Sequence, residues 1–315
     1  MNENGNKKII WITGGAGFLG RHLGQLINTN ENSNHVYGLG HGSWTENEYV
    51  RWGFKYWINS DISIDILNKL SNLTGLPDII FHLAGGASVG AAIDNPKIDF
   101  DRTVGASIEV LEWIRLNSPE TRLVAVSSAA VYGSGYEAQI CESSLANPYS
   151  VYGYNKFIME NLCKSYASSY GLRIVIPRIF SVYGPHLQKQ LLWDLCNKIS
   201  VGSKHIALAG SGQELRDWAD VSDVTRALVG MVNLASRDVP ILNIGTGIGT
   251  TVKDVVKRVI ENWEINIDFS FNGQSRTGDP FSLIANPNLL FESGFKFFKT
   301  LDVGVSSYVK WFRKL

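Results

Sequence analysis

The sequence has little of what marks several protein classes. Its 315 residues include only three cysteines, Cys141, Cys163 and Cys196, which are far apart and odd in number. This pattern argues against a disulfide framework, and no CxxC motif or Cys/His cluster indicates a zinc site. We therefore expect reduced thiols, no bound metal and a cytoplasmic protein.

The formal net charge is zero, because 29 Lys and Arg residues balance 29 Asp and Glu residues. Such a balance provides no general attraction for nucleic acid or a membrane surface, and we expect neither as a partner. No run of about 20 apolar residues occurs, which excludes an ordinary membrane-spanning helix. The polar residues 1–8 lack the apolar core of a signal peptide.

What the sequence does contain is an alternation of short β-rich segments with longer amphipathic ones. This alternation implies right-handed crossovers and an α/β fold, a Rossmann doubly wound parallel sheet. The pattern predicts strands at residues 8–13, 35–39, 78–83, 122–127 and 172–179, and helices at 17–28, 104–116 and 152–170.

The rhythm changes after about residue 181. Helices are predicted at 187–201 and 251–263, and an apolar strand at 239–244 is expected to return to the sheet. We expect a dinucleotide-binding domain of residues 1–180 with a returning segment at about 217–250. A smaller, interleaved substrate-binding lobe is expected to comprise residues 181–216 and 251–315.

The strongest local signal is Thr13-Gly-Gly-Ala-Gly-Phe-Leu-Gly20, which follows the first strand and opens the first helix. In this context Gly14 makes the tight turn, Gly17 lets the backbone approach a pyrophosphate, and Gly20 lets the helix pack on the strand. The pyrophosphate is expected at the helix N-terminus, beside Phe18 and Leu19, where free N–H groups are available.

The residues after the second strand bear on the choice of cofactor. An acid usually stands there to bind the adenosine ribose of NAD, but this chain has Gly40 at that position. His41 and Ser43 are able to bond a 2′-phosphate, although no arginine accompanies them. We therefore prefer NADP as the cofactor and keep NAD as the alternative.

Tyr152 and Lys156 are spaced to share one face of a helix. A nearby ammonium and an oxidised nicotinamide both favour phenolate, which predicts a pKa for Tyr152 about three units below its ordinary value. Tyr152 is then able to act as general acid and base, with Ser128 at a strand end bonding the same substrate oxygen.

These motifs, with those that follow them, resemble the extended short-chain dehydrogenase/reductases that act on nucleotide sugars. Further matches include Phe81-His-Leu-Ala-Gly85, Ser127-Ser-Ala-Ala-Val-Tyr-Gly133 and Arg178-Ile-Phe-Ser-Val-Tyr-Gly-Pro185. The resemblance implies a homodimer, formed through the helices at 104–116 and 152–170. It also implies cofactor contacts from Asp61, Ile62, Leu83, Ala84, Gly85, Thr103 and Ile179, of which Thr103 replaces a common asparagine.

The same resemblance implies a nucleoside-diphosphate sugar as substrate. Arg216 and Arg276 correspond to arginines that bind the diphosphate, for which a charged planar fork is suited. The other expected substrate contacts are Ser88, Ser181, His186, Lys189 and Gln190.

Departures from the family pattern limit which reactions are expected. Ala129 and Ala130 stand where 4,6-dehydratases carry an Asp-Glu pair, so a dehydratase is not expected. Three reactions are consistent with the remaining residues: a 4-keto-sugar reductase, a 4-epimerase that keeps NAD bound, and a C4 dehydrogenase. Of these we prefer the reductase. The complete set of Ser128, Tyr152 and Lys156 argues against a non-catalytic sensor.

Overall fold

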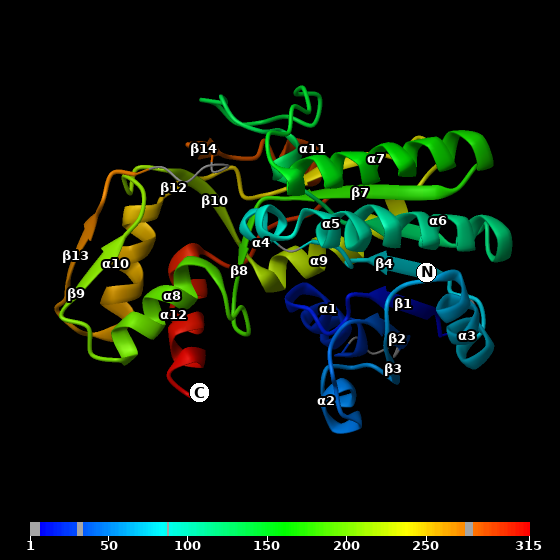
Figure 1. Ribbon diagram of the computed structural model, residues 1–315, viewed down its shortest axis with the longest axis horizontal. Helices are drawn as coiled ribbons and strands as arrows, with labels where there is room; N and C mark the ends of the chain where they lie inside the picture. Colours follow the sequence, from blue (N-terminus) through cyan, green and yellow to red (C-terminus); the bar gives the residue numbers. More distant parts are fainter. Residues whose placement is uncertain (1–6, 30–33, 87, 275–279) are drawn as a thin grey trace. The chain divides into compact units, whose positions relative to one another are not determined.

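The computed structural model describes residues 7–29, 34–86, 88–274 and 280–315 (Figure 1). The chain forms two compact units that interleave along the sequence. The first unit comprises Met1–Tyr132, Pro148–Arg178 and Thr225–Leu242, and the second comprises Gly133–Asn147, Ile179–Val224 and Asn243–Leu315.

The main sheet has the strand order β11-β7-β5-β4-β1-β2-β3, with β6 paired to β7. The chain builds outward from β1 to β3 and then returns to β4 on the other side of β1, so the order reverses between β1 and β4. This confirms the predicted doubly wound parallel sheet. The strands are β1 (Ile9–Thr13), β2 (His35–Gly40), β3 (Tyr56–Asn59), β4 (Ile79–His82), β5 (Arg122–Ala125), β6 (Ser127–Ser128), β7 (Arg173–Ile179) and β11 (Ile241–Ile244).

Right-handed crossovers place α1 on one face of this sheet and α3, α6 and α7 on the other. Helix α6 is preceded by a π-helical turn, Asp101–Gly105, where the sequence predicted a regular start at residue 104. The helices are α1 (Phe18–Thr29), α2 (Glu46–Arg51), α3 (Ile64–Thr74), α4 (Val89–Asp94), α5 (Pro96–Phe100), α6 (Ala106–Asn117) and α7 (Val151–Tyr170), and the 3₁₀ turn Ala129–Val131 follows β6.

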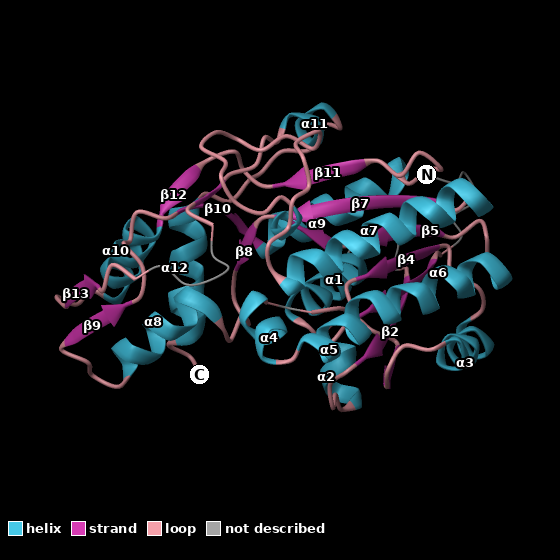
Figure 2. Ribbon diagram, turned by 45° about the horizontal axis from the view of Figure 1, so that its top comes forward, coloured by secondary structure: helices cyan, strands magenta, loops and turns pink. Residues whose placement is uncertain are grey.

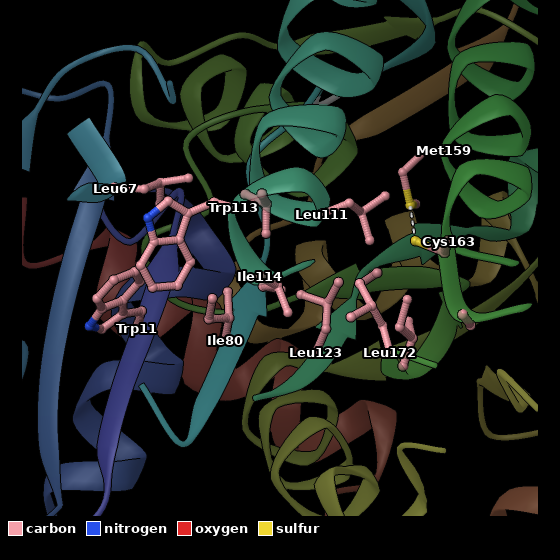
Figure 3. Close-up of a cluster of buried hydrophobic side chains, with 14 of the residues drawn as sticks. Trp11, Leu67, Ile80, Leu111, Trp113, Ile114, Leu123, Met159, Cys163 and Leu172 are labelled. Carbon is pink, nitrogen blue, oxygen red and sulfur yellow. Dashed lines mark hydrogen bonds between the residues drawn. The ribbon is translucent and has the colours of Figure 1, made fainter. Parts of the chain in front are cut away.

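A buried apolar cluster holds α3, α6 and α7 against the sheet (Figure 3). Trp11 of β1 packs on Trp113 of α6 with ring centroids 4.8 Å apart, and both rings are fully buried. Met159 and Cys163 extend the cluster along α7. Because buried aromatic and aliphatic area is the main stabilising term, this cluster fixes α7, the helix that carries the predicted catalytic residues.

The second unit contains a four-stranded sheet of order β12-β10-β14, with β8 paired to β10, and a separate parallel pair, β9 and β13. Three helices of this unit pack through aromatic rings, as in the contact of Trp193 with Phe312 at 5.1 Å between centroids. The elements are β8 (Ser181–Tyr183), α8 (Gln190–Ser200), β9 (His205–Leu208), β10 (Leu215–Asp220), β12 (Gly249–Thr251), α10 (Val252–Trp263), β13 (Asp268–Phe271), β14 (Ser282–Leu283), α11 (Asn288–Glu292) and α12 (Leu301–Phe312), while α9 (Val221–Met231) leads back into the first unit (Figure 2).

The observed division differs from the expected one in two segments. Gly133–Asn147 lies in the second unit, because the backbone of Ile140 bonds to Ile284 and Asn286. The segment that returns to the first unit is Thr225–Leu242, not 217–250, because β10 pairs with β8, β12 and β14. Of the helices described, none is long and apolar enough to cross a membrane.

Candidate active site

The first helix and the ends of three strands form a tight backbone cradle. Gly14 has φ of +71°, and a Cβ on it would lie 2.9 Å from the amide nitrogen of Ala84 after β4. A Cβ on Gly40, after β2, would lie 3.1 Å from the nitrogen of Gly14, and one on Gly20 would contact the Gly14 carbonyl oxygen. Only glycine allows this approach, which leaves the N-terminus of α1 open to an anion. These residues fit the pyrophosphate of a dinucleotide.

The turn after β2 contains an ion pair that the sequence did not predict. Nε2 of His41 lies 2.7 Å from Oδ1 of Asp61, and both side chains are largely exposed. Ser43 is exposed as well, and Ile62 packs against the edge of the apolar core. His41 is therefore engaged by a carboxylate and does not stand alone as a ligand for a 2′-phosphate.

The catalytic helix begins at a well-formed cap. Oγ of Ser150 accepts a hydrogen bond from the amide of Gly153 at 3.1 Å, which starts α7 just before Tyr152. Lys156 follows one turn later on the same face, only 4% exposed, and its Nζ donates to the carbonyl of Val126 at 3.0 Å. The predicted spacing of Tyr152 and Lys156 is thus realised within one turn of α7, in which Tyr152 is partly buried and Lys156 is buried.

Ser128 is hydrogen-bonded to Tyr152, a contact that the sequence analysis did not specify. The Ser128 hydroxyl accepts the amide proton of Ala130 at 3.2 Å, which leaves its own proton for the phenolic oxygen. The first unit therefore brings together Ser128, Tyr152 and Lys156, although they come from separate segments.

The protein's own groups do not produce the lowered pKa of Tyr152 that was expected from Lys156 together with an oxidised nicotinamide. Burial raises the pKa of Tyr152, the bond from Ser128 lowers it, and the charge of Asp99 raises it further. Burial also lowers the pKa of Lys156 to about 8, against the raising effects of Asp99, Glu160 and Cys163. The protein alone thus keeps Tyr152 protonated, and phenolate formation needs a further positive charge, such as that of an oxidised nicotinamide.

A second buried network supports the loop that follows β4. Nδ1 of His82 lies 2.7 Å from Oγ1 of Thr13, and Nε2 lies 2.9 Å from Oγ of Ser107. Ser107 donates to the carbonyl of Thr103 at 2.5 Å, so Nε2 of the ring carries the proton. Oγ1 of Thr103 accepts the amide proton of Gly86 at 2.8 Å. Thr103, predicted as a cofactor residue, thus holds the backbone next to Leu83, Ala84 and Gly85.

This network makes stability depend on pH. Burial lowers the pKa of His82 to about 3 from an ordinary 6.5, so below pH 6.5 the unfolded chain binds a proton that the folded chain excludes. The stability is present above pH 6.5 and is lost as the pH falls towards 3, by about 1.4 kcal/mol per pH unit. We measure the free energy of unfolding by urea titration at several pH values between 3 and 6.5. It should fall less steeply with decreasing pH in the His82→Gln variant than in the parent protein. Equal slopes in both proteins would refute the assignment.

The residues predicted to contact substrate lie mostly in the second unit. Ser181 of β8 pairs with Trp218 of β10, and Nη1 of Arg216 donates to the carbonyls of Leu215 at 2.9 Å and Phe281 at 3.2 Å. His186 has φ of 72°, and its ring packs against Trp311 with centroids 5.0 Å apart and the planes tilted by 48°. Lys189 and Gln190 are exposed at the start of α8, and Ser88 of the first unit caps α4. Ile179, a predicted cofactor contact, is buried at the end of β7. Arg276 lies outside the described residues.

Several polar residues of the first unit were not singled out from the sequence. Asp99 and Asn155 bond to each other beside Lys156, and Glu160 forms a buried ion pair with Arg178. Asp99 and Glu160 occur on amphipathic segments, where acidic residues ordinarily face solvent. Their spacing therefore carried no signal, although the position of Glu160 four residues after Lys156 was a hint.

Comparison with known proteins shows the family to which this chain belongs. A family model described as the NAD dependent epimerase/dehydratase family matches residues 10–245. A putative UDP-glucose 4-epimerase of Methanocaldococcus jannaschii is 28% identical, with 97% of this chain and 98% of that protein covered.

Two solved structures share the fold over almost the whole chain. A UDP-glucose 4-epimerase of Thermotoga maritima, solved with UDP-glucose, is 26% identical with a TM-score of 0.84. A UDP-glucose 4-epimerase of Thermus thermophilus, solved with NAD, is 25% identical with a TM-score of 0.86. In both comparisons 97% of this chain and 99% of the other are covered.

Proposed function

Because this chain is an enzyme of the NAD dependent epimerase/dehydratase family, we propose that it interconverts the C4 epimers of a UDP-sugar with NAD retained throughout turnover. The observation that carries the proposal is the site itself. The set of proposed catalytic residues is complete, with Ser128, Tyr152 and Lys156 all present. The 3₁₀ turn Ala129–Val131, which follows Ser128, contains no acidic or basic side chain. The relatives named as UDP-glucose 4-epimerases support the same reaction.

The chain's own groups account for the proton movements of such a reaction. Tyr152 removes the proton of the C4 hydroxyl as hydride leaves C4, and Ser128 bonds the same oxygen. Bound NAD supplies the hydride acceptor. For the other epimer to form, the hydride would have to return to the opposite face of C4, and Tyr152 would give its proton back to the C4 oxygen. No further acid or base is required, in agreement with Ala129 and Ala130.

We favour NAD over the NADP preferred from the sequence. Asp61 places a carboxylate against His41, at the turn where a 2′-phosphate would have to be accommodated. A carboxylate repels a phosphate dianion, and no arginine follows Gly40 in this turn to offset it. A solved relative with NAD bound supports the same choice.

For the same reason we rank the 4-keto-sugar reductase below the epimerase. A reductase exchanges its cofactor at each turnover, and NADPH is the usual donor for that purpose. The missing acid at Gly40 was the argument for it, and the ion pair of His41 with Asp61 weakens that argument.

The proposal is tested by identifying the dinucleotide and the reaction in one preparation. Freshly purified protein is denatured and its released nucleotide identified by mass spectrometry, and a second portion is incubated with UDP-glucose. We expect about one NAD per chain and formation of UDP-galactose without added cofactor, and related UDP-sugars are assayed in parallel. An empty or NADP-loaded protein that acts only on 4-keto nucleotide sugars with NADPH would overturn the proposal.

A further inference from the structure

A buried carboxylate lies beside the catalytic pair. Asp99 of α5 is only 5% exposed, and its Oδ2 accepts a hydrogen bond from Nδ2 of Asn155 at 2.7 Å. Asn155 is itself 4% exposed and directly precedes Lys156 in α7. A buried carboxylate is costly unless it is paired, and the charge of Asp99 acts on the buried ammonium of Lys156 without a direct ion pair, so the position of Asp99 needs a role.

The loop after β4 lies against both charges. A Cβ on Gly85 would lie 3.0 Å from Nζ of Lys156, and a Cβ on Gly86 would overlap Oδ1 of Asp99. The amide of Gly86 is held at 2.8 Å by Oγ1 of Thr103. Two consecutive glycines therefore contact the ammonium and the carboxylate in turn, and side chains at either position would displace one of them.

We propose that Asp99 is a positioning residue of this active site, whose fixed negative charge balances Lys156 and holds Tyr152 in its protonated form until the cofactor is oxidised. The inference rests on the assignment of Tyr152 and Lys156 as the acid/base pair. It does not depend on which sugar is the substrate.

The other groups around the pair do not supply this charge. Glu160 is neutralised by the fork of Arg178, and burial raises the pKa of Cys163 to about 12, so that thiol is neutral. Burial lowers the pKa of His82 to about 3, so the ring is neutral too. Glu160 also raises the pKa of Lys156, but of the described carboxylates Asp99 has the larger effect there and is the one that also raises the pKa of Tyr152.

The position of this charge affects both members of the pair. Asp99 raises the pKa of Lys156, which keeps the ammonium charged in spite of its burial, and it raises the pKa of Tyr152. Removal of the charge should therefore make Tyr152 a stronger acid and Lys156 a weaker base.

The Asp99→Asn variant tests this directly, because asparagine has the same shape and is able to keep a hydrogen bond to Asn155. We measure tyrosinate absorbance of the purified protein against pH and subtract the titration of Tyr152→Phe, which isolates Tyr152. We expect its midpoint to fall by about one pH unit in Asp99→Asn, as for one charge removed at short range. Cofactor content is matched between the proteins beforehand.

Two controls separate charge from structure. Asp99→Glu keeps the charge, and its midpoint should stay close to that of the parent protein. Asp101→Asn removes an exposed carboxylate that pairs with Lys97 on the surface, and should leave the midpoint unchanged. If Asp99→Asn does not fold, Asp99→Ser removes the same charge and its titration decides instead.

An unchanged midpoint in the folded charge-removing variant would overturn the proposal, as would an equal shift in Asp101→Asn. The titration uses no substrate, so it succeeds or fails independently of the epimerase assay.

Discussion

Replacement of Tyr152 by Phe is expected to lower kcat for C4 epimerisation by about 10²–10⁴-fold, the range typical for loss of a positioned general acid/base. Tyr152 is the phenol that is hydrogen-bonded to Ser128 and that we propose as the general acid and base. The removal of a single oxygen leaves the packing of α7 intact. The rate of product formation at saturating UDP-sugar measures the effect.

Tyr154 provides the matched control for this prediction. It lies two residues further along α7, but its ring is 52% exposed. Tyr154→Phe removes the same oxygen from the same helix and should leave kcat within about two-fold, as is usual for a surface change. If Tyr152→Phe were as active as Tyr154→Phe, the assigned chemistry would be wrong.

The ion pair of Glu160 with Arg178 carries the largest expected effect on stability. Both side chains are buried, and the guanidinium donates from Nε to Oε1 at 2.9 Å and from Nη2 to Oε2 at 2.6 Å. Ser127 donates to Oε1 at 2.6 Å, and the guanidinium lies 4.6 Å from the ring of Tyr132. Arg178→Met would leave a carboxylate buried without its partner, which should lower the free energy of unfolding by about 3–5 kcal/mol.

Arg173 is the control, because it lies on the same strand β7 but pairs with Glu120 at the surface. Arg173→Met should cost no more than about 1 kcal/mol, the usual value of an exposed pair. Urea unfolding of the two variants compares them directly. Equal losses would mean that burial of the Glu160 pair does not determine its contribution.

Much of the first unit was predictable because its signals are local. Most strands of the parallel sheet are short apolar runs that burial on both faces makes recognisable, but β3 and β6 carry polar residues and were not predicted. The glycine-rich loop was readable because close backbone approach excludes side chains at Gly14 and Gly20. Tyr152 and Lys156 were predictable as a pair because helix geometry alone places residues four apart on one face.

The division into units was less predictable, because strand pairing is not local. The segment Gly133–Asn147 has no regular helix or strand, and its place in the second unit follows from backbone bonds to residues more than a hundred positions away. β10 was expected mostly in the first unit but lies in the second, because its strand partners β8, β12 and β14 come from three distant segments.

The sequence by itself was enough to predict the sheet, the glycine-rich loop and the trio proposed to be catalytic, since each is carried by short local motifs. Only the tertiary structure decided the charges around that trio. Asp99, Glu160 and His82 are far from Tyr152 or ambiguous along the chain, and the fold buries them where a low dielectric strengthens every interaction. Spacing along the chain could not show that burial and Asp99 both raise the pKa of Tyr152, against the lowering predicted from Lys156 and an oxidised nicotinamide.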